Sequence, residues 1–174
     1  GSRSDGVVVR YLSDGALDTN FGSGGKVICP IGELGNIVIQ PDDKIVVAGD
    51  HFGLARLNSD GSFDTGFGAD GIVAGVSTLS TPGGDVVPNS WRGGLAMQAD
   101  GKLVESGLAV SLAGCAAVGH PSALVRYNAD GTLDASFGTG GWVFTYIGPI
   151  SRANDVKIQP DGKIVAAGIT KPNC

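Results

Sequence analysis

The chain is poor in charged, aromatic and sulfur-containing residues. Charged residues make up 17% and aromatic residues 6% of its 174 residues, and there are three cysteines and one methionine. The net charge of −5 at pH 7 provides no basic surface, so we expect no nucleic-acid partner. No apolar run approaches the roughly 20 residues of a membrane-spanning helix, so we expect no membrane insertion.

The signatures of catalytic and metal sites are missing as well. Cys29, Cys115 and Cys174 follow no metal-binding spacing, and their odd number argues against a closed intrachain disulfide framework. The sequence has no GxSxG or GxxxxGK motif, no cysteine paired with a plausible histidine base, and no calcium-loop run of aspartates. We therefore expect no cofactor, no metal and no catalytic residue. This weighs against an enzyme without excluding one.

Glycine, in contrast, is abundant. It supplies 30 of the 174 residues without a collagen-like period, so the chain must contain many turns. The low lysine content and the many Ser, Thr, Asn and Gly residues are typical of secreted or surface proteins, and we expect an extracellular or cell-envelope location. Residues 1–6 are a lead-in. They open with Gly1-Ser2, which is typical of a cloning remnant, so a natural leader could have been removed.

Two motifs alternate along the chain, and each occurs three times. The first, R…DGx(L/F)DxxFGxxGxV, begins at Arg10, Arg56 and Arg126. The second, close to IQPDGKIVxAG, contains Gln40, Gln98 and Gln159, which are 58 and 61 residues apart. A repeat of this length is the signature of a protein built from similar structural units.

Each repeat predicts four short strands, here named A to D. In the second repeat they cover residues 37–40, 44–49, 54–58 and 72–75, which are rich in Val, Ile and Leu and are bounded by turn residues. The A–B turns read Pro-Asp-Asp, Ala-Asp-Gly and Pro-Asp-Gly, which is hairpin chemistry. No segment shows a helical period. Four antiparallel strands in a repeat of this length are typical of a β-propeller blade.

The two motifs together resemble the bacterial delta-60 repeat, a propeller family similar to the NHL repeats. The resemblance covers nearly the whole chain and implies the fold. It implies no enzymatic activity that could be transferred to particular residues.

The repeats predict an all-β half-propeller with two whole blades and one split blade. Residues 7–31 form a C–D half-blade, 36–77 and 94–147 whole blades, and 153–170 an A–B half-blade. Three blades cannot close a ring, and six is the multiple of three within the usual four to eight. We therefore predict a homodimer that closes as a six-bladed ring, each A–B half completing the partner's C–D half. A fragment of a longer propeller, or a half-propeller with no function of its own, are the alternatives.

Function is expected on one face of the propeller. The A–B and C–D connections emerge on one face and are nearly identical in all copies, whereas the B–C and D–A connections vary strongly. The longest of these variable connections are residues 76–93 and 108–122. Since loops on a rigid scaffold usually carry binding, we favour a non-catalytic binding module that presents this face to a protein or glycan. Insertions without a role are the simpler alternative.

The enzyme alternative is a lyase or hydrolase acting on a polysaccharide or small ligand at the central channel. It requires polar side chains from several blades to converge there. The candidates for such a cluster are Glu33, Asp50, Glu105, Arg152 and Asp155.

Individual residues stand out against the repeat. The ligand-face candidates are Trp91, Arg92, His120, Glu105, Asp50, His51 and Arg152. Glu105 occupies the strand B position of Val47 and Ala166, so it is either a functional acid with a raised pKa or a side chain that points to solvent. Three arginines and three aspartates, each pair eight residues apart, predict structural ion pairs rather than an anion site: Arg10, Arg56 and Arg126 with Asp18, Asp64 and Asp134.

Overall fold

The structure, a computed structural model, describes residues 5–81, 83–90 and 93–173. Antiparallel strands dominate this part of the chain, together with a short α-helix, α1 (Cys115–Val118), and a 3-10 turn, η1 (Asp50–Phe52). Neither is long or apolar enough to cross a membrane, and the described residues contain no other candidate span. The fold is all-β, as the sequence predicts.

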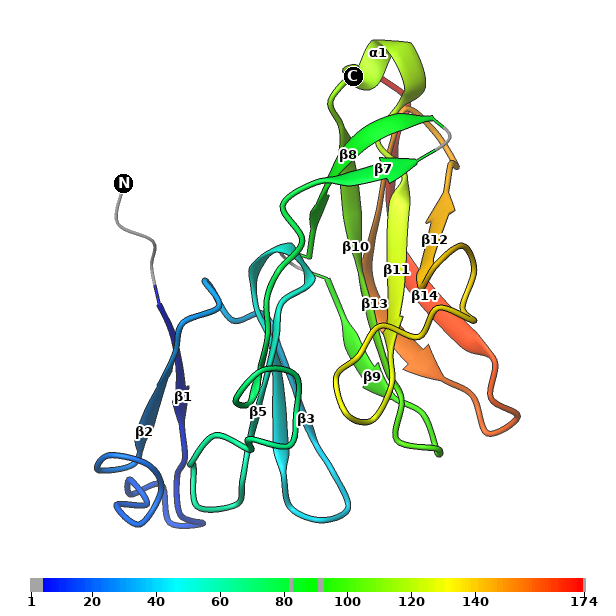
Figure 1. The fold of residues 1–174 in the computed structure, drawn as a ribbon. Coiled ribbons are helices and arrows are strands. Elements are labelled where there is room, and N and C mark those ends of the chain that lie inside the picture. The colour runs from blue at the N-terminus through cyan, green and yellow to red at the C-terminus, as the bar shows by residue number, and fades with distance from the viewer. Residues whose placement is uncertain (1–4, 82, 91–92, 174) are drawn as a thin grey trace.

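Four sheets follow one another along the chain and stand side by side (Figure 1). The first is the hairpin of β1 (Gly6–Val9) and β2 (Lys26–Cys29). The second has the order β3 (Asn36–Ile39), β4 (Ile45–Ala48), β5 (Leu54–Leu57) and β6 (Ile72–Val73). The last is the hairpin of β13 (Ile150–Ile158) and β14 (Ile164–Lys171).

The third sheet is the largest. Its central strand, β10 (Leu103–Ser111), pairs with β11 (Ser122–Tyr127), which pairs with β12 (Trp142–Thr145). On its other side, β10 pairs with β9 (Leu95–Met97) over its first three residues and with β8 (Gly84–Asn89) over its last four. The short strand β7 (Leu79–Thr81) pairs with β8 and ends the sheet.

The two long variable connections are therefore not loops throughout, and this part of the sequence interpretation is wrong. Residues 76–93 contain the β7–β8 hairpin, and residues 108–122 begin with the end of β10 and include α1. The hairpin joins the third sheet by pairing with β10, where Val86 of β8 lies opposite Ser111 and both residues are buried. The insertions thus extend one blade as ordered secondary structure.

Burial follows from how many neighbours each sheet has. β4 and β5 are buried along their whole length because sheets lie against both of their faces. β1 and β2 alternate between buried and exposed residues because only one face is covered. The main core lies between the second and third sheets, where Phe52 meets the edge of the Trp142 ring at a centroid distance of 5.0 Å.

The connections define two faces of the molecule. The A–B and C–D turns lie on what we call the lower face, at the bottom of Figure 1. The B–C and D–A connections, with η1, the β7–β8 hairpin and α1, lie on the upper face. The three Asp-Gly turns of the lower face place Gly15, Gly61 and Gly131 at φ values of 88°, 88° and 85°, as their sequence predicts.

Gly61 and Gly15 provide a matched pair of substitutions. Both have φ near 88°, but a Cβ at Gly61 would lie 2.7 Å from the backbone nitrogen of Gly22, whereas a Cβ at Gly15 meets nothing within 4 Å. We expect Gly15→Ala to cost about 1 kcal/mol of unfolding free energy from the positive φ alone. Gly61→Ala should cost clearly more, because the added methyl group separates two blades. Urea unfolding of both variants measures the difference, and equal losses would contradict the packing argument.

Candidate functional site

The lower face repeats one arrangement of three side chains. In each copy an arginine Nε donates to an aspartate Oδ2 at 2.7–2.8 Å, in the pairs Arg10–Asp18, Arg56–Asp64 and Arg126–Asp134. The same guanidinium lies 4.5 Å above the ring centroid of a phenylalanine, in turn Phe21, Phe67 and Phe137. Each side-chain set holds a C–D turn in place.

This arrangement also joins neighbouring blades. Arg56 Nη1 donates to the carbonyl of Ala129 in the next blade at 2.6 Å, and Arg10 donates in the same way to the carbonyl of Ser59. Backbone bonds run beside them, from Gly22 N to Asp60 O and from Gly68 N to Asp130 O, both 2.8 Å long. We call this repeated set of arginine, aspartate and phenylalanine side chains the structural clamp. Its polar side chains bind one another and the backbone of the next blade.

A lysine at the start of strand B completes the clamp in the two whole blades. Lys44 Nζ lies 2.8 Å from Asp64 Oδ2, and Lys102 Nζ lies 2.9 Å from Asp134 Oδ2. The hydrogen bond from Lys44 is the main cause that lowers the pKa of Asp64 to about 2, with Gly66 N and Arg56 also contributing. Ser136 and then Lys102 lower the pKa of Asp134.

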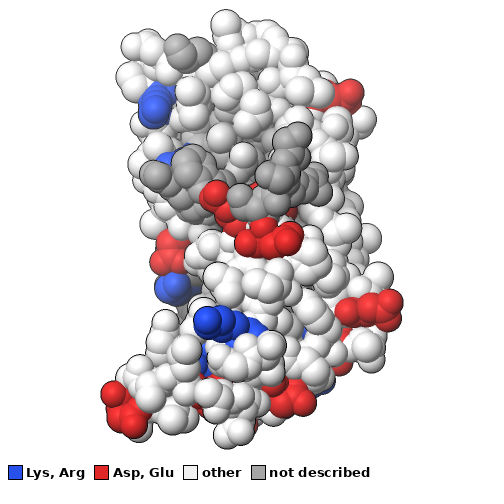
Figure 2. Space-filling model, turned by 90° about the vertical axis from the view of Figure 1, so that its left-hand side faces the viewer, with Lys and Arg blue, Asp and Glu red and all other residues white. Residues whose placement is uncertain are grey.

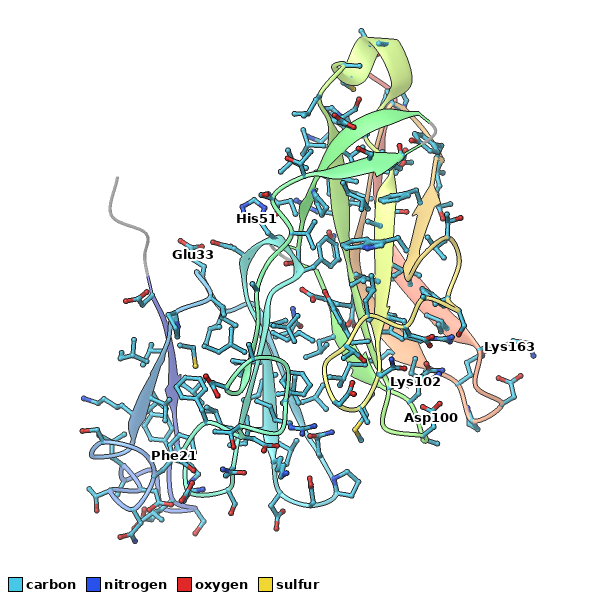
Figure 3. All side chains as sticks on the ribbon, in the orientation of Figure 1. Phe21, Glu33, His51, Asp100, Lys102 and Lys163 are labelled. Carbon is cyan, nitrogen blue, oxygen red and sulfur yellow. The ribbon has the colours of Figure 1, made fainter. Side chains whose placement is uncertain are left out.

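Of the candidate residues, Figure 3 shows Glu33 and His51 on the upper face. His51 and Phe52 hold φ values of 56° and 63°, which non-glycine residues seldom adopt. Hydrogen bonds from the third sheet hold this turn: His51 Nδ1 lies 2.8 Å from Pro88 O, and Tyr127 Oη donates to Phe52 O at 2.7 Å. The turn is thus a fixed connector between two blades.

Glu105 lies beneath this turn. It is 1% exposed on β10, opposite Leu95 and Val125, so the interpretation that it points to solvent is wrong, and it does not lie on the ligand face. Neither carboxyl oxygen has a hydrogen-bond partner among the described residues. The one hydroxyl proton of nearby Ser90 goes to Gly49 O, at 2.6 Å. Burial raises the pKa of Glu105 well above its ordinary value, and the Ser90 hydroxyl only partly offsets the rise.

Among the described residues, the remaining candidates do not form one cluster. His120 Nδ1 accepts a bond from Ser111 N at 3.1 Å, and Arg152 Nε donates to Asn154 on the outer side of β13. Asp155 pairs with Lys157, and Asp50 accepts a long bond from Glu33 N at 3.4 Å. Trp91 and Arg92 lie outside the described residues. In the described ranges, no three His, Cys, Asp or Glu side chains could hold a metal ion.

The cysteines differ from expectation. Cys115, in α1, is disulfide-bonded, so the argument from their odd number was wrong. Cys29 is free and buried at the end of β2, and burial raises the pKa of its thiol to about 11. A thiol with such a pKa is protonated at neutral pH and is a poor nucleophile.

A groove on the third blade was not foreseen from the sequence. The β7 strand curls towards β12 and bounds a groove of about 490 Å³. Its lining includes Trp142 and Phe144, whose rings are stacked with centroids 6.0 Å apart, and the hydroxyl residues Ser80, Thr81 and Thr139. Sequence reasoning missed it because its two walls, residues 79–81 and 138–144, belong to an insertion and to a repeated turn.

Adjacent antiparallel sheets with the A–B–C–D strand order define the class of this protein as a β-propeller. A family model described as "Domain of unknown function (DUF5122) beta-propeller" matches residues 1–21, 40–67 and 121–137. Each matched segment contains one Arg–Asp–Phe set of the lower face. A comparison with curated proteins found no match. The chain carries β-propeller repeats whose shared element is the structural clamp.

The clamp should make the stability of the fold depend on pH in the acidic range. Because the folded state lowers the pKa of Asp64 from 3.8 to about 2, its ionised form stabilises the fold above pH 4, and this contribution is lost as the pH falls through 2. Asp64→Asn should therefore cost about 1–2 kcal/mol at pH 7 and progressively less below pH 4. Chemical unfolding across this range tests it, with the exposed Asp14→Asn as the control. A loss that is independent of pH would contradict the prediction.

Glu105 should make the stability of the fold depend on pH in the opposite direction. Since its pKa is raised in the folded state, the unfolded chain loses this proton first, and stability falls as the pH rises above about 4.5. Glu105→Gln, which is neutral and of the same size, should remove this fall, so its advantage over the parent chain grows as the pH rises above 5. Glu33→Gln, at an exposed position, should not change the profile.

Proposed function

We propose that the chain is a non-catalytic β-propeller binding module and that the groove between β7 and β12 binds a carbohydrate. The observation that carries this proposal is the partly exposed ring of Phe144, which is stacked on the buried Trp142, beside a rim of hydroxyl side chains. A sugar ring presents an apolar C–H face and a periphery of hydroxyl groups, which matches such a lining. The volume of about 490 Å³ lies in the range of small-ligand sites.

Rigidity supports a binding role. The groove's inserted wall is the β7–β8 hairpin, which is hydrogen-bonded to β10 in the same sheet as β12. Ser80 Oγ donates to Asp85 Oδ1 at 2.8 Å, so its oxygen remains an acceptor in a fixed position. Thr81 Oγ1 donates to Gly84 O at 2.7 Å and accepts from Gly83 N at 3.2 Å, which fixes its position as well. A preorganised wall of this kind lowers the entropy cost of binding.

A protein partner is the second candidate, favoured by a different observation. Leu112, Tyr146 and Ile147 are all more than half exposed around α1 on the upper face. Exposed apolar side chains that gather in this way often mark a protein contact. An enzyme acting at the central channel is less well supported, because Glu105 is buried and Asp155 is paired with Lys157.

The proposal also assigns the repeat to a particular family. The motifs DGx(L/F)DxxFGxxGxV and IQPDGKIVxAG support a delta-60 repeat of NHL-like type. The composition, poor in lysine and rich in small polar residues, supports an extracellular or cell-envelope location. A glycan ligand and such a location agree with each other.

Thr139→Lys tests the groove. Thr139 is exposed at the rim, so a lysine there blocks the groove without disturbing the core. Screening the chain on a panel of defined oligosaccharides, followed by titration calorimetry, should give binding that Thr139→Lys weakens at least tenfold, about 1.4 kcal/mol. Ala69→Lys, at the equivalent repeat position outside the groove, is the control and should bind normally. If no panel member binds, or if both variants bind like the parent, the carbohydrate site is excluded and the protein contact becomes the better hypothesis.

A further inference from the structure

A second pocket lies on the upper face, where the first and second sheets meet. It has a volume of about 220 Å³ and three walls. The first wall is the connection between β2 and β3 (residues 30–32), the second is formed by Asp50 and His51 of η1, and the third by residues 72, 74, 75 and 77, at and after β6. This pocket shares no lining residue with the groove between β7 and β12, so the two sites are separate.

Backbone hydrogen bonds fix the three walls relative to one another. Asp50 N donates to Ile31 O in the first wall, and Val76 N in the third wall donates to His51 O, both at 2.9 Å. Gly53 N donates to Asp50 O at 3.0 Å and closes the turn of the second wall. The walls come from separate parts of the sequence, yet their positions do not depend on a ligand.

The carboxylate of Asp50 extends from η1 towards the first wall. A Cβ added to Gly32 would collide with its Oδ2, so the glycine makes room for the carboxylate there. Among the bonds of the described residues, this carboxylate accepts only one, a long bond of 3.4 Å from Glu33 N. Asp50 therefore keeps most of its capacity to accept hydrogen bonds from a ligand.

His51 provides a second acceptor. Its Nδ1 lies 2.8 Å from the carbonyl oxygen of Pro88. Because a carbonyl oxygen only accepts, Nδ1 carries the hydrogen, and Nε2 of the neutral ring is an acceptor. The exposed Ser77 adds a hydroxyl group to the opposite wall of the pocket.

The surroundings of the pocket favour a positively charged ligand. Glu33 is exposed beside Asp50, and the lining contains no lysine or arginine. Figure 2, which faces the side of the molecule bearing β1 and β2, shows acidic side chains gathered near the middle of that side. The chain as a whole carries a net charge of −5. An anionic ligand would be repelled here, and a cation attracted.

The lining also distinguishes between kinds of cation. A metal ion needs several ligand side chains, and the described ranges hold no group of three His, Cys, Asp or Glu residues that could supply them. A quaternary ammonium group is recognised by aromatic faces, and the lining has no Phe, Tyr or Trp. A primary ammonium group carries three N–H donors, which match a carboxylate, an imidazole nitrogen and a hydroxyl oxygen.

We propose that this pocket binds a primary ammonium group, either of a small amine or of a lysine side chain on a protein partner. Asp50 is its counter-ion, and His51 Nε2 and Ser77 Oγ accept its remaining hydrogen bonds. The volume of about 220 Å³ is below the roughly 300 Å³ at which drug-sized sites begin, so the pocket takes the amine and a few carbon atoms.

The first test compares four probes by titration of the ¹⁵N-labelled chain, followed by amide chemical shifts. Ethanolamine and Nα-acetyl-lysine methylamide carry the primary ammonium group, whereas ethylene glycol is neutral and tetramethylammonium is quaternary. The two amines should shift the resonances of Gly32, His51 and Ser77 and bind at least about tenfold more tightly than the two controls, because their hydrogen bonds to Asp50 are charge-assisted. The tighter of the two amines identifies the source of the group. No response to either amine, or an equal response to tetramethylammonium, would overturn the proposal.

The second test changes the pocket. Asp50→Asn keeps the shape of the side chain and removes its charge, so it should weaken binding of the better amine at least tenfold, about 1.4 kcal/mol. Its control is Asp43→Asn, at an exposed position in the turn between β3 and β4 on the lower face, which should bind like the parent chain.

Ser77→Lys provides an independent check, since it places a competing ammonium group in the pocket wall and should abolish binding of the added amine. Thr78→Lys introduces the same charge at the next exposed residue, outside the lining, and should leave binding intact. Parent-like binding by Asp50→Asn or by Ser77→Lys would show that the amine binds elsewhere and would refute the assignment of this pocket.

Discussion

The arginine of each repeat is the element on which the arrangement of blades depends. Its Nε binds the aspartate eight residues later, its plane stacks on a phenylalanine, and, at Arg10 and Arg56, its Nη1 binds a carbonyl of the next blade. One side chain thereby fixes a C–D turn and the position of a neighbouring sheet. A guanidinium suits this role because it offers five donors in a rigid plane, where lysine offers a single flexible charge.

Because the clamp uses only the lower face, the upper face can vary from repeat to repeat. The lower face cannot accept insertions without breaking the clamp, and its turns are almost the same in all three repeats. The third blade, by contrast, lengthens strand B into the nine residues of β10 and adds the β7–β8 hairpin along it. The groove between β7 and β12 is a product of that lengthening. A uniform structural face and a variable face are what a binding scaffold requires.

The burial of Glu105 is an unfavourable contribution to the stability of the same blade. Strand B carries Val47 and Ala166 at this position in the other repeats, and the third repeat buries a carboxyl group there without a hydrogen-bond partner among the described residues. Its raised pKa keeps it neutral over a wider pH range than an exposed glutamate. It lies close to the strained turn of His51 and Phe52, which joins the second and third blades.

The sequence alone determined the strands, the turns and the arginine–aspartate pairs of the clamp, because these depend on short-range patterns repeated three times. Strand A to strand D, the positive φ of Gly61 and the partnership of Arg56 with Asp64 all follow from residues within one repeat. Only the tertiary structure decided the burial of Glu105, the disulfide at Cys115 and the groove between β7 and β12. Each of these depends on which segments of different repeats come to lie against one another. The insertions that bring them together occur once in the chain, so no internal comparison could reveal where they fold.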